Sequence, residues 1–292
     1  MVTLRTAATK ASVALSTTAL IGLGISPAAA SEPATVFEAA QQALDLDSRD
    51  AATIPGVDAQ AAEGSAEVAL GDFEVRIEAT ATDSDTTILP DGIRVMSLLE
   101  EGDSQTDFQL SLPDGALLVP HEAGYAIVID AGGTRIALAH VAEPWAVDAD
   151  GHEVSTSYAL SGNVLTQRIE GDDIAYPVVA DPTITVGVVG ATDGPGAYWN
   201  MTGSQARAIA AVTATTLGNA LAAGCVGAAK IPRVGYIIQG VCGYVGVPTL
   251  KNMWGSVTRI MRSTRVQNSA CYQIKIVPRG TGLRKTARRN CA

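Results

Sequence analysis

Apolar and polar residues alternate along the middle of the chain. In the stretch DFEVRIEAT, the apolar residues Phe73, Val75 and Ile77 fall on one face of an extended strand and the charged residues fall on the other. Seven further segments with a period of two follow, and turn sequences such as LPDG, DAGG and DADG separate them. This spacing predicts an antiparallel β domain, sandwich- or barrel-like, over residues 67–189.

A helical period precedes this region. The stretch ATVFEAAQQALDL places four apolar residues at helical spacing, namely Val36, Phe37, Ala40 and Leu44. The next segment, IPGVDAQAAEGS, breaks that period with Gly, Pro and polar residues. We therefore expect one short helix and a flexible connector over residues 31–66.

Beyond a Gly-rich linker at residues 190–196, the pattern is helical again. Thr202 is a candidate N-cap for a helix that begins near residue 203. Small residues recur there at every fourth position, namely Ala206, Ala210, Ala214, Gly218 and Ala222. A second uncharged stretch, VGYIIQGVCGYVGVP, follows the interruption KIPR. The two stretches predict a helical hairpin whose backbones approach closely.

The segment KNMWGSVTRIMRSTR predicts a basic amphipathic helix. Its polar face would carry Lys251, Arg259, Arg262 and Arg265, and its apolar face would carry Met253, Trp254, Val257, Ile260 and Met261. Such a helix is typical of a segment that lies on a membrane surface. The alternative is that the apolar side packs on the hairpin while the arginines are simply solvated.

The predicted fold class is therefore α+β in two parts. An antiparallel β domain comes first. A small disulfide-stapled domain over residues 197–292 would follow, with the helical hairpin, the basic helix and a short strand at YQIKIV.

Charge divides the chain at the same place. Residues 31–193 hold all thirty acidic residues and five basic ones, whereas residues 194–292 hold thirteen Lys and Arg and no acid. The division indicates two domains with different surfaces, a basic half that meets an anionic partner, or two halves that meet each other. The residues expected to bind an anion or a membrane are Lys251, Trp254, Arg259, Arg262, Arg265, Arg284, Lys285, Arg288 and Arg289.

The N-terminus has the three parts of a secretory signal peptide. Arg5 and Lys10 form a positive region, an uncharged apolar stretch follows, and Ala28–Ala30 supplies the small residues for cleavage after Ala30. A retained N-terminal anchor is the alternative. We expect residues 1–30 to be removed and the mature protein to be extracellular or associated with the cell wall.

All four cysteines, Cys225, Cys242, Cys271 and Cys291, lie in the acid-free half. An even number in an exported domain predicts two disulfides, and the sequence alone allows three pairings. Cys225 and Cys242 lie at similar distances from KIPR, which favours their pairing and leaves Cys271 for Cys291. That half contains no His and no C-x-x-C, so a zinc site is not expected there.

The sequence offers no catalytic motif, cofactor or metal site. G-x-S-x-G, H-E-x-x-H and the P-loop are all absent. His121, His140 and His152 could converge as metal ligands, but three scattered histidines are more typical of surface and turn positions. DADGHEVSTSYA begins like a calcium loop but lacks the required Gly and bidentate Glu, so a β-turn is expected.

Residues 147–184 resemble a recurring stretch in secreted actinobacterial proteins of unknown function. In those proteins a β module closes in the motif Y-P-V-V-A-D-P, found here as Tyr176–Pro182, and a variable cysteine-containing C-terminal domain follows. The resemblance implies export and a modular design. It implies no catalytic residue.

Three function hypotheses follow. In the first, the protein is envelope- or membrane-active, bacteriocin- or toxin-like, and the acidic β domain masks or carries the basic domain. In the second, it is a non-enzymatic cell-wall module that binds anionic polymers. In the third, it is a secreted hydrolase with dispersed catalytic residues. We expect no sequence-specific nucleic-acid binding, because the aromatic residues of the basic half form no evident stacking platform.

Overall fold

The computed structural model describes residues 33–44, 56–121, 124–187, 193–263, 265–280 and 282–292. The predicted signal peptide lies outside the described residues, as do residues 45–55 of the predicted connector. The predicted short helix is present as α1 (Pro33–Ala43). It buries Phe37 and Ala40 against Met96, Val147 and Val179 of the β region, as its apolar period requires.

Six antiparallel strands form the first sheet, in the order β1-β2-β3-β6-β12-β11. Their bounds are β1 (Val57–Ala62), β2 (Ser65–Leu70), β3 (Phe73–Ala79), β6 (Gln105–Ser111), β11 (Ser155–Ser161) and β12 (Val164–Glu170). Buried residues alternate with exposed ones along β3, which confirms the predicted face of Phe73, Val75 and Ile77.

The prediction of a flexible connector up to residue 66 is wrong for its last part. Residues 57–66 form β1 and the beginning of β2, with Val57 opposite Leu70 and Ala62 opposite Ser65. β1 is an edge strand whose residues are mostly exposed. A strand that buries so little has no apolar alternation, so its sequence looks like a connector.

Eleven antiparallel strands form the second sheet. Its main order is β10-β13-β5-β14-β9-β15-β16-β17, with β4 beside β5 and with β8 between β7 and β9. The bounds are β4 (Ser84–Leu89), β5 (Gly92–Leu99), β7 (Ala116–His121), β8 (Gly124–Asp130), β9 (Arg135–Val141), β10 (Ala146–Val147), β13 (Val178–Ala180), β14 (Thr183–Val186), β15 (Ala197–Thr202), β16 (Cys271–Val277) and β17 (Leu283–Thr286).

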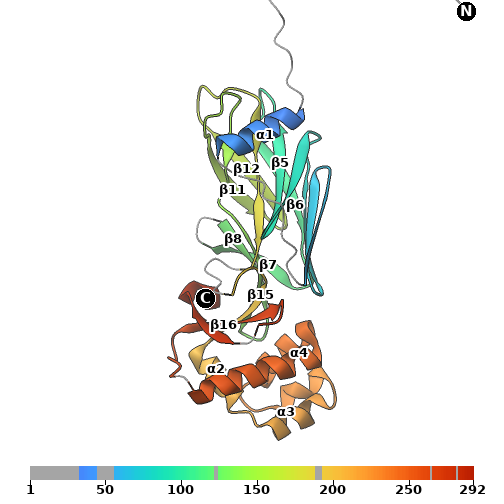
Figure 1. Cartoon of the computed structure of the whole chain (residues 1–292), viewed down its shortest axis with the longest axis vertical. Helices are drawn as coiled ribbons and strands as arrows, with labels where there is room; N and C mark the ends of the chain where they lie inside the picture. Colours follow the sequence, from blue (N-terminus) through green and yellow to red (C-terminus); the bar gives the residue numbers. More distant parts are fainter. Residues whose placement is uncertain (1–32, 45–55, 122–123, 188–192, 264, 281) are drawn as a thin grey trace, which may run out of the picture. The chain divides into compact units, whose positions relative to one another are not determined.

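This second sheet runs across the point at which the charge of the sequence changes sign. β9 belongs to the acidic part. β15 and β16, both labelled in Figure 1, belong to the acid-free part. β15 pairs with β9 on one side, with Tyr198 opposite Ala137, and with β16 on the other, with Asn200 opposite Gln273. The acidic and acid-free parts therefore share backbone hydrogen bonds in one sheet.

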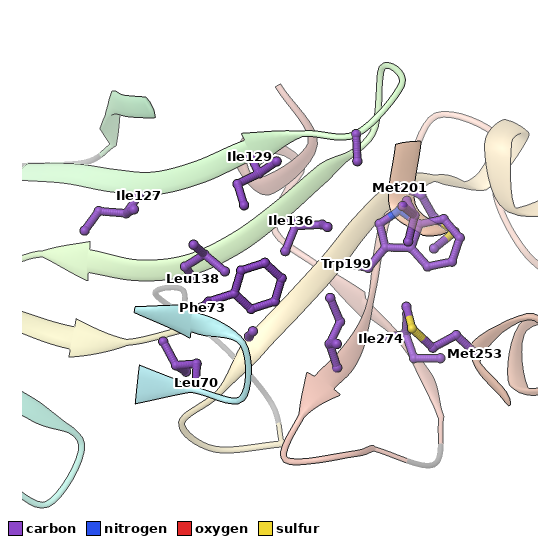
Figure 2. Packing of buried hydrophobic residues seen from close by; sticks show 14 of the residues in the cluster. Leu70, Phe73, Ile127, Ile129, Ile136, Leu138, Trp199, Met201, Met253 and Ile274 are labelled. Atoms are coloured by element: carbon purple, nitrogen blue, oxygen red, sulfur yellow. The ribbon is translucent and has the colours of Figure 1, made fainter. Parts of the chain in front are cut away.

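They also share one hydrophobic core. Figure 2 shows side chains from both sheets and from α4 (Gly235–Ser263) in a single apolar cluster. The labelled residues include Leu70, Phe73, Ile127, Ile129, Ile136, Leu138, Trp199, Met201, Met253 and Ile274. Trp199 of the acid-free part is fully buried and belongs to the same cluster as apolar residues of the acidic part.

The helical region follows β15. It comprises α2 (Gly203–Ala210), α3 (Ala214–Leu221), the 3₁₀ helix η1 (Cys225–Lys230) and α4, and the chain ends with the 3₁₀ helix η2 (Arg288–Cys291). Thr202 caps α2 as predicted, because its hydroxyl accepts a hydrogen bond from the Gln205 backbone N–H at 3.3 Å. Within the described residues, no helix is long and apolar enough to cross a membrane.

The prediction that the first arm of the helical hairpin is one continuous helix is wrong, because the segment forms two helices, α2 and α3. Thr213 begins a second helix, since its hydroxyl accepts from the Thr216 backbone N–H at 3.1 Å. The predicted second arm and the basic helix are both present within α4. They are separated by the non-helical residue Gly246, and Pro248 lies just after this break, before the basic helix begins.

Two disulfides close the helical and C-terminal segments. Cys225 of η1 is bonded to Cys242 of α4, and Cys271 of β16 is bonded to Cys291 of η2, which confirms the favoured pairing. Loops of this length stabilise a folded chain by about 3 kcal/mol each in the chain-entropy account. Disulfides of this kind are typical of an oxidising extracellular environment.

Candidate anion-binding site

The basic helix packs its apolar side into the protein. Leu250, Met253 and Val257 are 1%, 3% and 0% exposed and belong to the main core cluster. Trp254 is half-buried, and its indole Nε1–H donates to the Ile209 carbonyl of α2 at 3.2 Å. The structure therefore matches the alternative in which this face packs on neighbouring helices.

The opposite side of the same helix carries exposed cations beside a pocket. Lys251, Gly255 and Arg259 recur at every fourth residue and so lie along one stripe of α4. Arg279, from the turn between β16 and β17, approaches this stripe. Together with Asn252, Ser256 and Gly280, these residues line a pocket of about 320 Å³, which we call the cationic pocket.

A second pocket adjoins the first on the same helix. It has a volume of about 420 Å³ and is lined by Trp254, Gly255, Thr258, Arg259 and Arg262. Gly255 and Arg259 line both pockets. We call it the tryptophan pocket, because Trp254 is its one aromatic residue.

The electrostatics of both pockets favour an anion. None of the residues that line them is acidic, and residues 194–292 contain no Asp or Glu. Three cationic side chains, those of Lys251, Arg259 and Arg279, therefore surround the cationic pocket. Guanidinium and ammonium groups bind phosphate or carboxylate through charge-assisted hydrogen bonds.

The hydroxyl groups at the two pockets are engaged with the helix backbone. The Ser256 hydroxyl donates to the Asn252 carbonyl at 3.2 Å, and the Thr258 hydroxyl donates to the Trp254 carbonyl. No histidine occurs in residues 194–292 that could serve either hydroxyl as a base. The arrangement of cations at the pockets can therefore hold an anion.

The remaining predicted binding residues lie outside these pockets. Arg265, Arg284, Lys285, Arg288 and Arg289 are exposed and line neither pocket. Arg284 forms an ion pair with Asp193 at 3.6 Å, and Lys285 donates to the Gln267 side chain at 3.1 Å. The basic C-terminus thus carries several separate contacts and does not extend the site on α4.

Sequence reasoning missed Arg279 as a site residue. It is one of thirteen basic residues in the acid-free half, and it lies twenty residues beyond Arg259. The turn sequence Pro278–Arg279–Gly280 after the predicted strand was the available signal, because a turn can return the chain to a neighbouring helix. The sequence does not indicate that α4 is the helix to which this turn returns.

Among the residues that the structure describes, one ion pair joins the acidic half to the basic half. This is the pair of Arg284 with Asp193, whose side chains are 60% and 27% exposed. Lys275 adds a hydrogen bond of 2.7 Å to the Asp193 carbonyl. Backbone pairing and apolar packing account for most of the contact between the halves that the structure describes.

The three histidines do not converge. The rings of His121 and His140 have centroids 5.4 Å apart, and His121 Nε2 lies 3.1 Å from Asn290 Oδ1. His121 and His140 lie in β7 and β9, whereas His152 lies in a turn beside Asp148, whose carboxylate accepts backbone hydrogen bonds from Asp150 and His152. Across the described ranges, no group of three or more His, Cys, Asp or Glu could hold a metal ion.

A buried polar network surrounds Asp181 of the Y-P-V-V-A-D-P motif. The carboxylate is fully buried, accepts hydrogen bonds from Thr183 and from the Trp145 backbone N–H, and lies 3.7 Å from Arg94 Nε. Burial raises the pKa of Asp181 to about 7, although Thr183, Arg94 and Trp145 all act to lower it. Arg94 in turn lies 5.7 Å from the centre of the Trp145 ring. The network ties strands of the second sheet together.

No protein-family model matches this chain, and neither a curated protein nor a solved structure matches it.

Proposed function

We propose that the protein is an exported, non-enzymatic module that binds an anionic polymer of the cell envelope through α4. The observation that carries the proposal is the division of this helix into two sides. Met253 and Val257 lie in the core, while Lys251 and Arg259 surround a pocket with Arg279. A cationic surface of this kind attracts polyanions.

Export is part of the proposal. The two disulfides support an oxidising environment, and the N-terminal thirty residues have the composition of a cleaved signal peptide. In that environment the accessible polyanions include phosphate-containing polymers of the wall. The acidic β region, with a formal charge of −25 over residues 31–193, would then face away from such a polymer.

The buried apolar side of α4 favours polymer binding over insertion into a membrane. Insertion would require Met253 and Val257 to leave the core, where both are almost fully buried. Removing two such side chains from a core costs about 1.5–3 kcal/mol each before any gain from the bilayer. Binding of a polyanion at the exposed side needs no such rearrangement.

The test uses the mature chain and immobilised poly(glycerol phosphate). The pocket variant combines Lys251→Gln, Arg259→Gln and Arg279→Gln. The control variant combines Lys285→Gln, Arg265→Gln and Arg288→Gln, which removes the same numbers of Lys and Arg from exposed positions outside both pockets. Affinity is measured by calorimetry or interferometry at several salt concentrations.

The pocket variant is expected to lose about tenfold or more in affinity, and the control variant about threefold or less, because non-specific charge contributes to both. The salt dependence should also become shallower in the pocket variant, since fewer ion contacts form. Equal losses in the two variants would contradict a localised site. Failure of the unmodified chain to bind would contradict the function itself.

A further inference from the structure

The two pockets on α4 differ in chemistry although they adjoin. The cationic pocket is lined by Lys251, Arg259 and Arg279, together with Asn252. The tryptophan pocket has an indole ring at one side, with Arg259 and Arg262 on its border. Charge is thus concentrated in the first pocket, whereas the second combines a flat apolar surface with cations at its edge.

The indole ring is held in a fixed position. Its only hydrogen-bond donor, Nε1–H, is engaged by the Ile209 carbonyl at 3.2 Å. Trp254 therefore presents ring carbon atoms, and no polar atom, to the pocket. Such a surface suits the C–H groups of an uncharged unit rather than another anion.

Gly255 connects the two pockets. It lines both, and a Cβ atom at this position would meet no heavy atom within 4 Å. The space above this residue is therefore open, and no side chain separates the pockets there. A glycine in the middle of a helix costs about 1 kcal/mol relative to alanine, so a position with room for a side chain gains nothing structurally from glycine.

We propose that the connected pockets bind consecutive units of a polyol phosphate chain. One phosphate occupies the cationic pocket, and the neutral polyol carbons that follow lie on Trp254. The next phosphate then meets Arg262 at the far border of the tryptophan pocket. This inference rests on the proposed function and specifies its ligand: a polymer in which anionic phosphodiesters alternate with short uncharged units.

Two other ligand classes fit less well. A single-stranded nucleic acid would bring a large base to every unit, and the two pockets together offer one aromatic side chain. A flat anionic lipid surface would be expected to use exposed apolar anchors, whereas Leu250, Met253 and Val257 of the basic helix lie in the core. An alternating phosphate and polyol chain uses both pockets and the open connection at Gly255.

The test blocks this connection without a change of charge. Gly255→Leu places a branched apolar side chain into the space shared by the pockets. Gly243→Leu is the control, since Gly243 lies in the first helical segment of α4, before the non-helical Gly246, is exposed, and has no atom within 4 Å of an added Cβ. Binding of poly(glycerol phosphate) to the mature chain is measured for both variants, and thermal unfolding confirms that both fold.

Gly255→Leu is expected to lower the affinity about tenfold or more, and Gly243→Leu about twofold or less, because only the first enters the site. Gly255→Ala provides a smaller obstruction, with an expected loss of about threefold, should the leucine variant not fold. A second pair tests the far border: Arg262→Gln should lower the affinity at least about threefold more than Arg265→Gln, which lines neither pocket.

The outcomes separate this inference from the function on which it rests. If the triple cationic-pocket variant loses binding but Gly255→Leu and Arg262→Gln do not, the polymer uses the cationic pocket alone and the inference is overturned. If the unmodified chain does not bind poly(glycerol phosphate), both proposals fall. If Gly255→Leu impairs binding to vesicles of phosphatidylglycerol but not to the polymer, the site serves a lipid surface and the inference is again wrong.

Discussion

The indole Nε1–H of Trp199 donates a hydrogen bond of 2.9 Å to the hydroxyl of Thr134. Thr134 belongs to the turn between β8 and β9 in the acidic part, and Trp199 belongs to β15 in the acid-free part. Both residues are buried. The Thr134 hydroxyl also donates to the Ala131 carbonyl at 2.7 Å, so one buried side chain connects the turn to the strand that begins the acid-free half.

This shared interior predicts that the two parts unfold together. In Thr134→Val, the Trp199 N–H loses its acceptor inside the core, and we expect the free energy of unfolding to fall by about 1–3 kcal/mol. Urea unfolding of the mature chain should remain a single transition by tryptophan fluorescence and by far-ultraviolet circular dichroism.

Thr156→Val is the matched control. Its hydroxyl also donates to a backbone carbonyl, that of Arg168, but in an exposed setting, so a change within about 0.5 kcal/mol is expected. Two separate transitions in the unmodified chain would show that the acidic and acid-free parts are independent despite their common sheet.

A second prediction concerns the close approach of the DAGG turn to α4. Gly132 and Gly240 bring the two backbones together, because a Cβ at Gly240 would lie 2.9 Å from the Ala131 carbonyl carbon. Gly240→Ala should therefore lower the free energy of unfolding by about 1–3 kcal/mol, although alanine is the better helix former.

Gly243→Ala, three residues further along the same helix, separates the two effects. An added Cβ there meets nothing within 4 Å, so helix propensity alone should raise the stability by about 0.5–1 kcal/mol. Thermal or urea unfolding of the two variants side by side measures the contrast. A stabilising effect of Gly240→Ala would mean that the turn does not contact the helix in solution.

The sequence predicted the elements with one buried face well. The alternation in DFEVRIEAT and the helical spacing in ATVFEAAQQALDL both correspond to observed elements, because each element buries one face and exposes the other. The placement of the cysteines about KIPR likewise indicated the observed pairing of Cys225 with Cys242.

The shared sheet could not be predicted in the same way. β15 buries both of its faces: Trp199 lies in the main core, while Tyr198 packs with Ala126, Val128 and Ala137 on the other side. A strand that is buried on both faces has no alternation, so AYWNMT shows no strand period. Its place beside β9 depends on a pairing between residues about sixty positions apart, which local pattern does not encode.

The candidate site was predictable only in part. The basic stripe of α4 follows from helical spacing, and Lys251, Arg259 and Arg262 are exposed as expected. The pocket itself depends on Arg279, which reaches the helix from a different element. Whether the apolar side of the helix faces a membrane or a core is likewise a tertiary property, since amphipathicity is the same in both cases.

The last prediction concerns pH and the buried carboxyl group of Asp181. Its pKa is raised from 3.8 to about 7, chiefly because burial disfavours the charged form. Between about pH 4 and pH 7 the folded state therefore binds more protons at this group than the unfolded state. The contribution of Asp181 to the free energy of unfolding must then fall as pH rises through that window, by up to about 1.4 kcal/mol per pH unit, and become constant above it.

Asp181→Asn isolates this contribution. The amide is neutral at every pH and keeps an oxygen that can accept from the Trp145 backbone N–H, which donates to Asp181 Oδ1 at 3.4 Å. The free energy of unfolding should be measured by urea titration for both proteins between pH 4 and pH 8. The free energy of unfolding of the unmodified protein, minus that of the variant, should decrease as the pH rises towards 7. A difference that increases with pH would instead mean that the charge of Arg94, 3.7 Å away, outweighs burial and holds the pKa of Asp181 below its ordinary value.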